Sequence, residues 1–166
     1  MWMSAHALAI IQSLGLISAA NGAPVLVAWV LGARFARPID ARIVLRDGRP
    51  LLGHSKTWRG LASAIVLASC VAVLIGLPWR LGALVAISAM VGDSLSSFVK
   101  RRFGLEPSSM TLGLDQVPES LCPALACALY LPLGPADILA IVLVFSVGEL
   151  AMSRLFFAVG LRTRPY

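Results

Sequence analysis

The sequence predicts an all-α integral membrane protein with five transmembrane helices and two polar cytoplasmic loops, forming a single domain over residues 1–166. Hydrophobic residues make up 58% of the chain and charged residues only 13%. A soluble domain is about half apolar and about a quarter charged. The mean hydropathy is +0.86, and the apolar residues gather in runs long enough to cross a bilayer.

The placement of the basic residues sets the expected orientation. With five spans, the loop over residues 34–59, the loop over residues 100–118 and the C-terminus share one side of the membrane. Of the 14 basic residues, only Arg80 falls clearly on the other side. Basic loops stay in the cytoplasm. We therefore expect a multi-pass protein of the cell (inner) membrane, with the N-terminus outside and both loops and the C-terminus cytoplasmic.

The first predicted span covers residues 5–31 and is interrupted at residues 21–24. Pro24 cannot donate a backbone hydrogen bond, and Asn21-Gly22 forms turns readily. We therefore expect the first helix to be broken or strongly kinked there. Broken helices at membrane depth often line a cavity, so Asn21 either faces the functional site or bonds a neighbouring helix. His6 has no evident partner and is interpreted as interfacial.

The first polar loop is strongly basic. Its only acids are Asp40 and Asp47, against seven basic residues: Arg34, Arg37, Arg42, Arg46, Arg49, Lys56 and Arg59. Lys56, Arg59 and the Thr57 hydroxyl stand at the start of the second span, where they form a compact set of phosphate-binding groups. Trp58 fits an aromatic residue at the membrane interface.

The third span, residues 81–99, carries the most informative polar stretch. The second span, 61–77, has no such feature. A carboxylate within the bilayer costs about 2.5–3.5 kcal/mol on insertion scales, so Asp93 is a functional candidate. Helical spacing puts Asp93, Ser97 and Lys100 on one stripe. Lys100, Arg101 and Arg102 then end the helix, either as a phosphate-binding cluster or as an ordinary cytoplasmic flank.

The second polar loop leads into a short fourth span over residues 119–131. Asp115 and Gln116 precede this helix, Pro118 suits its first helical position, and Glu119 is an acid in its opening turn. The span crosses a bilayer only if flanking residues help or the bilayer thins.

The fifth predicted span covers residues 138–161, with Asp137 as its N-cap. Glu149 lies near the middle of this span. It is either a binding or catalytic group or a protonated side chain that makes a structural hydrogen bond. Asn21, Glu119 and Glu149 therefore remain additional site candidates.

The unusual polar residues converge on the cytoplasmic face. Asp93 and Asp115 could hold Mg²⁺, which prefers oxygen ligands that it shares with substrate phosphates. The cations could neutralise charge that develops on a polyphosphate leaving group. The pattern predicts nucleotidyl or phosphoryl transfer between a soluble nucleotide and a lipid. No Ser/His/Asp or Cys/His arrangement indicates a covalent intermediate, and the three cysteines show no metal-binding spacing.

Four ordered motifs resemble those of the CDP-archaeol synthase family, the compact branch of the membrane CTP-transferases that include phosphatidate cytidylyltransferase. They are Gly53-x-x-Lys56-Thr57-Trp58-Arg59-Gly60, Gly92-Asp93, Ser97-Phe98-x-Lys100-Arg101-Arg102-x-Gly104 and Leu114-Asp115-Gln116. The resemblance covers most of the chain and implies one CTP-transferase-like domain. Where archaeal members usually have an acid and an aromatic residue after Leu-Asp-Gln, this chain has Val117-Pro118-Glu119-Ser120.

The resemblance implies that a lipid phosphate attacks the α-phosphorus of CTP, giving a CDP-lipid and pyrophosphate with Mg²⁺ as cofactor. The lipid is either an archaeal-type isoprenoid ether lipid phosphate or phosphatidate. By matched position, Asp93 and Asp115 would hold the metal and act in catalysis with Lys100. The implied CTP- and phosphate-binding residues are Lys56, Thr57, Arg59, Ser97, Arg101, Arg102 and Gln116. The expected partners are CTP, the lipid phosphate and the membrane, with no nucleic acid; the oligomeric state is not predicted.

Two other function classes compete with this hypothesis. A small non-catalytic membrane subunit could bind anionic lipid headgroups through its basic loops, but such a surface needs only cations, not Asp93 and Asp115. A transporter is disfavoured because the sequence has no inverted repeat and its polar residues, except Glu149, crowd one face rather than the midplane.

Overall fold

The computed structural model describes residues 2–105, 111 and 113–158, and the described part folds into helices without a named strand. The helices are α1 (Trp2–Leu31), α2 (Trp58–Leu74), α3 (Trp79–Arg102), α4 (Gln116–Cys127) and α5 (Pro135–Ala158). Among the described residues, α1, α3 and α5 are long and apolar enough to cross a membrane. With 17 and 12 residues, α2 and α4 are shorter. The all-α prediction is confirmed, whereas five complete spans remain a prediction.

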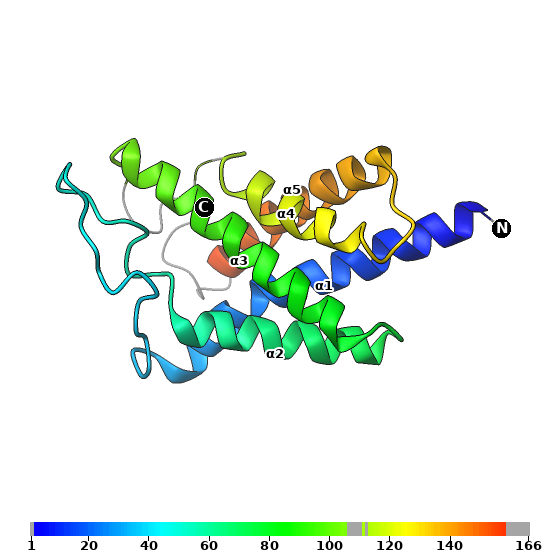
Figure 1. Ribbon diagram of the computed structural model, residues 1–166, viewed down its shortest axis with the longest axis horizontal. Coiled ribbons are helices and arrows are strands. Elements are labelled where there is room, and N and C mark those ends of the chain that lie inside the picture. The colour runs from blue at the N-terminus through cyan, green and yellow to red at the C-terminus, as the bar shows by residue number, and fades with distance from the viewer. Residues whose placement is uncertain (1, 106–110, 112, 159–166) are drawn as a thin grey trace.

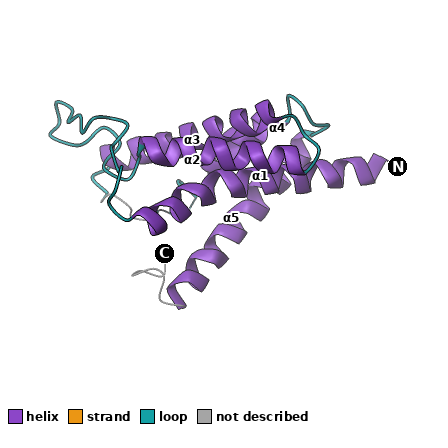
Figure 2. Ribbon diagram, turned by 90° about the horizontal axis from the view of Figure 1, so that it is seen from below, coloured by secondary structure: helices purple, strands orange, loops and turns teal. Residues whose placement is uncertain are grey.

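The helices run alternately in opposite directions (Figure 1). The loop between α1 and α2 and the described residues between α3 and α4 therefore lie at one end of the bundle, opposite the N-terminus. Figure 2 shows α5 leaving the other helices toward its C-terminal end. The loop end of the bundle gathers the polar residues on which the predicted site depends.

Small residues let the helices approach closely. A cluster of buried alanines joins α1, α2 and α3: Ala20, Ala64, Ala68, Ala86 and Ala89. On α3, a Cβ added to Gly82 would lie 2.3 Å from the Ala68 carbonyl oxygen. A Cβ added to Gly92 would lie 2.0 Å from the Pro118 carbonyl oxygen. Backbones that pack this closely at α3 leave no room for larger side chains.

The expected break in the first helix at residues 21–24 is wrong, because α1 is continuous from Trp2 to Leu31 with Pro24 inside it. A proline removes only one backbone hydrogen bond from a helix. The Pro24 ring packs at the start of α2, where a Cβ on Gly60 would lie 3.4 Å from the Pro24 Cβ. Helix packing thus holds α1 together where its local sequence favours a turn.

Two helices begin earlier than predicted, α4 by two residues and α5 by three. Pro118 is the third residue of α4 rather than the first, because α4 begins at Gln116. Asp137 lies inside the first turn of α5 rather than at its N-cap. Its carboxylate accepts a hydrogen bond from the Gly134 N–H at 2.8 Å. The same oxygen lies 2.7 Å from His6 Nδ1, so His6 does have a partner and joins α1 to α5.

Asp40 organises the loop between α1 and α2. Its buried carboxylate accepts hydrogen bonds from the N–H groups of Leu52 at 2.9 Å, Arg42 at 3.0 Å and Gly53 at 3.1 Å. Burial by itself would raise the pKa of Asp40, but these N–H groups outweigh it and hold the pKa below its usual value. The Ile39 N–H also donates to the Lys56 carbonyl at 2.8 Å, so Asp40 and Lys56 belong to one ordered unit.

We expect Gly92→Ala to destabilise the protein by about 1–3 kcal/mol, because the new methyl group would push α4 away from α3. A lower midpoint of thermal unfolding in detergent micelles measures this effect. Gly15→Ala is the matched control: it brings the same gain in helix propensity, but a Cβ at Gly15 has no neighbour within 4 Å. Equal midpoints for the two variants would show that the α3–α4 contact tolerates a methyl group.

We expect Asp40→Asn to raise the hydrogen-exchange rates of the Leu52 and Gly53 amides at least about tenfold at neutral pH, since hydrogen bonds to a charged acceptor contribute about 1.5–3 kcal/mol. In the unmodified protein, folding lowers the pKa of Asp40. The stabilisation that the Asp40 carboxylate provides is therefore complete above the ordinary carboxyl pKa of about 3.9, and it is lost as the pH falls through the lowered pKa. Asp47→Asn, in the same loop, should leave both amides unchanged. Fast exchange of both amides in the unmodified protein at pH 6 would contradict this role.

Candidate active site

The candidate site lies where α3 and α4 pack together at the loop end of the bundle. Gly92 brings the two backbones into contact, and the next residue, Asp93, is half-buried. The predicted stripe along α3 faces inward, since Ser97 and Lys100 are only 5% and 6% exposed. We name the acids and bases along this contact, together with Ser97 between them, the α3–α4 seam: Asp93, Ser97, Lys100, Asp115 and Glu119.

The first charge group of the seam surrounds Asp93. The Lys56 ammonium, from the loop before α2, forms an ion pair with the Asp93 carboxylate. The Glu119 side chain, from α4, is hydrogen-bonded to Asp93 and lies near the charges of Lys56 and Glu149. Three helices and one loop therefore contribute to this group, which includes two residues that the sequence left as additional candidates.

The second charge group surrounds Asp115, immediately before α4. Lys100 Nζ lies 2.7 Å from Asp115 Oδ1, and the two side chains are only 8% and 9% exposed. The Thr111 N–H donates to the other carboxylate oxygen at 2.8 Å, and the Arg101 charge lies near Asp115. Removing one partner of such a buried pair leaves an uncompensated charge, which costs about 3–5 kcal/mol.

Gln116 follows Asp115 and is 1% exposed. Its Oε1 accepts a hydrogen bond from the Gly113 N–H at 2.8 Å. Its buried Nε2 has no hydrogen-bond partner among the described residues. A buried donor without an acceptor is unfavourable, so this amide offers a hydrogen bond beside the second charge group.

The structure places other predicted site residues outside the seam. Arg102 pairs with Asp47 and donates to the Pro50 carbonyl at 2.7 Å. Arg59 donates to the carbonyl of Arg34. These two arginines fasten loop and helix ends together, and their predicted contact with phosphate remains a prediction.

Among the described residues, two further candidates make no hydrogen bond with the seam. The Thr57 hydroxyl accepts from the Gly60 N–H at 3.3 Å and caps α2. The buried Asn21 Nδ2 has no hydrogen-bond partner among the described residues. The bond to a neighbouring helix that was one alternative for Asn21 is therefore not seen for this nitrogen, and a role in the site remains a prediction.

Arg49 is a structural contributor that the sequence did not reveal. Its guanidinium donates to the carbonyls of Arg101 and Arg102 at the end of α3. Carbonyls at a helix C-terminus lack intrahelical partners, and arginine often satisfies them. The partners are more than 50 residues apart, so no local pattern could have identified this contact.

The acids of the seam suit Mg²⁺ by type and placement. Two carboxyl groups, those of Asp93 and Glu119, lie close together, and carboxylate oxygens are ligands that Mg²⁺ prefers. No three His, Cys, Asp or Glu residues form a metal-binding group within the described parts of the chain. In proteins, Mg²⁺ commonly uses one or two carboxylates and completes its ligands with water and substrate phosphates.

The chain is similar to known proteins in both sequence and fold. The model of the CarS-like CDP-archaeol synthase family matches residues 9–166. A CDP-archaeol synthase of Hyperthermus butylicus is 42% identical over 116 residues, which cover 66% of this chain and 64% of the relative. That of Pyrococcus furiosus is 36% identical over 58% of this chain and 60% of the relative. The chain thus spans less than two thirds of the length of these relatives.

Longer alignments agree with these matches. The CDP-archaeol synthase of Archaeoglobus fulgidus is 33% identical over 78% of this chain and 84% of the relative. A solved structure, described as structural insight into an intramembrane enzyme for archaeal membrane lipids biosynthesis, is 31% identical with a TM-score of 0.74. It covers 86% of this chain and 90% of its own. The all-α membrane fold is therefore shared with an intramembrane enzyme.

Proposed function

The chain belongs to the CDP-archaeol synthase family, and from that membership we propose that it is a CTP-dependent lipid cytidylyltransferase. An oxygen of a lipid phosphate would attack the α-phosphorus of CTP. The bond between the α-phosphorus and the bridging oxygen would break, releasing pyrophosphate and forming a CDP-lipid. The curated relatives favour an archaeal-type isoprenoid ether lipid phosphate as the acceptor, with phosphatidate as the alternative.

One observation carries the proposal: two acid–lysine pairs, Lys56–Asp93 and Lys100–Asp115, lie on one helix contact at the loop end of the bundle. Each pair combines a potential metal ligand with a potential phosphate ligand. A polyphosphate with a divalent cation presents the complementary combination of charges. The arrangement supports a nucleoside triphosphate site better than it supports a purely structural salt bridge.

The chain's own residues would bind and orient the nucleotide. Lys56 and Lys100, released from their acids, would hold the phosphates together with Arg101, and the free Gln116 amide would donate a further hydrogen bond. Ser97 lies between the two charge groups on α3 and would be a supporting polar contact. Preorganised cations in a site with little water stabilise charge on a leaving pyrophosphate strongly.

Mg²⁺ would be held by Asp93 and Asp115, and Glu119 would be a further polar contact beside Asp93. When bound, the ion would neutralise the negative charge on the transferring phosphoryl group. Glu119 stands four residues after Asp115 on α4, about 6 Å along the axis, so all three acids follow one short stretch of the seam.

The basic loops give the orientation. The seam and both loops would face the cytoplasm, where CTP is available, and the N-terminus would lie outside. A headgroup-binding membrane subunit is the weaker candidate, because such a protein has no use for acids paired with the lysines that contact lipid. The buried carboxylates of the seam favour the enzyme.

We expect Asp93→Asn to reduce Mg²⁺-dependent release of pyrophosphate from CTP at least about 100-fold, because the amide cannot neutralise Lys56 or bind the cation well. The assay uses purified protein, labelled CTP and an isoprenoid ether lipid phosphate or phosphatidate. Membrane insertion should be intact, as judged by yield in the membrane fraction.

Asp137→Asn is the matched control, since Asp137 lies at the opposite end of the bundle and pairs with His6. Its turnover should be close to that of the unmodified protein. Undiminished turnover of the Asp93 variant would refute the metal role, and no turnover by the unmodified protein with either lipid would refute the enzyme.

A further inference from the structure

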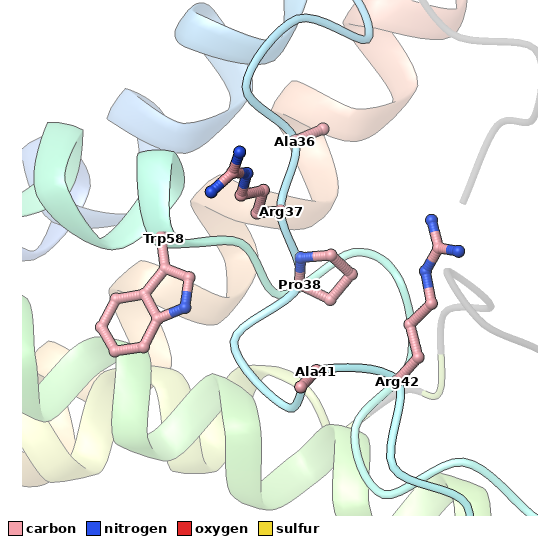
Figure 3. A pocket seen from close by; sticks show the side chains of 6 residues that line it. All are labelled: Ala36, Arg37, Pro38, Ala41, Arg42 and Trp58. Atoms are coloured by element: carbon pink, nitrogen blue, oxygen red, sulfur yellow. The ribbon is translucent and has the colours of Figure 1, made fainter.

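A second polar feature lies beside the seam. A cavity of about 480 Å³ is lined by residues that we name the arginine pocket: Ala36, Arg37, Pro38, Ala41, Arg42 and Trp58. In Figure 3, Trp58 and Arg42 lie on opposite sides of the pocket, with Pro38 and Ala41 between them. Its volume is typical of a small-molecule site, and its lining includes none of the seam residues.

The guanidinium groups of the two arginines of the pocket are available to bind a ligand. Among the described residues, no acceptor receives a hydrogen bond from the side chain of Arg37 or Arg42. Several other basic groups at this end are engaged: Lys56 and Lys100 with acids, and Arg49, Arg59 and Arg102 with carbonyls or Asp47. The nearby acid Asp40 is buried and satisfied by three N–H groups. Two such cations suit a phosphate, which guanidinium groups bind in bidentate fashion.

The turn that carries Arg42 has a constrained backbone. Ala41 and Arg42 have φ angles of +48° and +62°, in the left-handed region that non-glycine residues seldom adopt. The Arg42 N–H donates to Asp40 at 3.0 Å, which holds this turn in place. A turn that is already ordered at Arg42 loses less backbone entropy on binding.

Trp58 gives the pocket an apolar wall. Its side chain is 57% exposed at the first residue of α2, the position of an aromatic at the membrane interface. A free phosphate ion has nothing to place against an indole ring. A lipid phosphate has its glycerol and first methylene groups directly behind the phosphate, so cations and ring together match a lipid better than a free ion.

The pocket is joined to the seam through one segment. The Trp58 N–H donates to the Arg37 carbonyl at 3.1 Å, and the Ile39 N–H donates to the Lys56 carbonyl at 2.8 Å. The Lys56 ammonium in turn contacts Asp93. The backbone of residues 56–58 therefore connects the pocket to the Lys56–Asp93 ion pair, on which the proposed chemistry depends.

We propose that the arginine pocket binds the phosphate headgroup of the acceptor lipid, with Arg37 and Arg42 on the phosphate and Trp58 against the glycerol. This inference rests on the proposed function and adds the location of the second substrate. It gives the two substrates adjacent sites, with the nucleotide at the seam and the lipid phosphate at the pocket.

Steady-state kinetics of the full chain in detergent micelles test the assignment. We expect Arg37→Gln/Arg42→Gln to raise KM for the lipid phosphate at least about tenfold, the loss of roughly one charged contact, with kcat and KM for CTP unchanged. Arg46→Gln is the matched control, because Arg46 is an exposed arginine of the same loop outside the pocket. An unchanged KM for the lipid, or a raised KM for CTP instead, would overturn the proposal.

Binding without CTP separates this inference from the enzyme hypothesis. The probes are a short-chain glycerol ether or ester lipid phosphate, the same lipid without phosphate, and inorganic phosphate, with tryptophan fluorescence as the readout. We expect only the lipid phosphate to bind well, and Trp58→Phe and the double arginine variant to lose the response. If inorganic phosphate binds equally well, the pocket is a general anion site and the lipid assignment fails. If the lipid phosphate binds through the arginines but no cytidylyl transfer occurs, the proposed function fails and the pocket assignment stands.

Discussion

Acids and lysines that meet inside the bundle are the interaction on which the rest of the structure depends. A lone carboxylate or ammonium is strongly disfavoured away from water. Lys56–Asp93 ties the first loop to α3, and Lys100–Asp115 ties α3 to the start of α4. Because each charge requires its partner, the positions of the loop, α3 and α4 are linked. A group that replaces one partner, such as a phosphate or a divalent cation, must compensate the charge that it displaces.

The charge pairs require that the helices come close, and the glycines of α3 make this possible. The Pro118 carbonyl of α4 occupies the space that a Cβ of residue 92 would need. Glu119 follows Pro118 and Asp93 follows Gly92, so the backbone contact delivers the two carboxyl groups to each other. A larger residue at position 92 would separate the backbones and the acids together. The close packing of the helices and the meeting of the acids therefore depend on the same steric condition, a residue without a Cβ at position 92.

The seam could be predicted in part because helical periodicity is local. Spacing alone put Asp93, Ser97 and Lys100 on one stripe, and the last two are buried on α3. The partners of the stripe could not be derived this way, since Lys56 lies 37 residues from Asp93. The break expected near Pro24 was wrong. That expectation considered the backbone hydrogen bond that proline removes from a helix, but not the packing of the proline ring on α2. The helical spacing was therefore predictable, whereas the contacts between distant segments, including the one at Pro24, were not.

The irregular loop between α1 and α2 behaves as part of α3 because it is fastened to that helix at two points. Lys56 contacts Asp93 in the second half of α3, and Arg49 donates to the carbonyls at its C-terminal end. Between these points, Asp40 gathers the backbone N–H groups of Leu52 and Gly53. A loop with only one attachment would place Lys56 at variable distances from Asp93. With two attachments and a buried carboxylate between them, the position of Lys56 is determined by the loop's own hydrogen bonds, so residues far from the chemistry control the geometry of the seam.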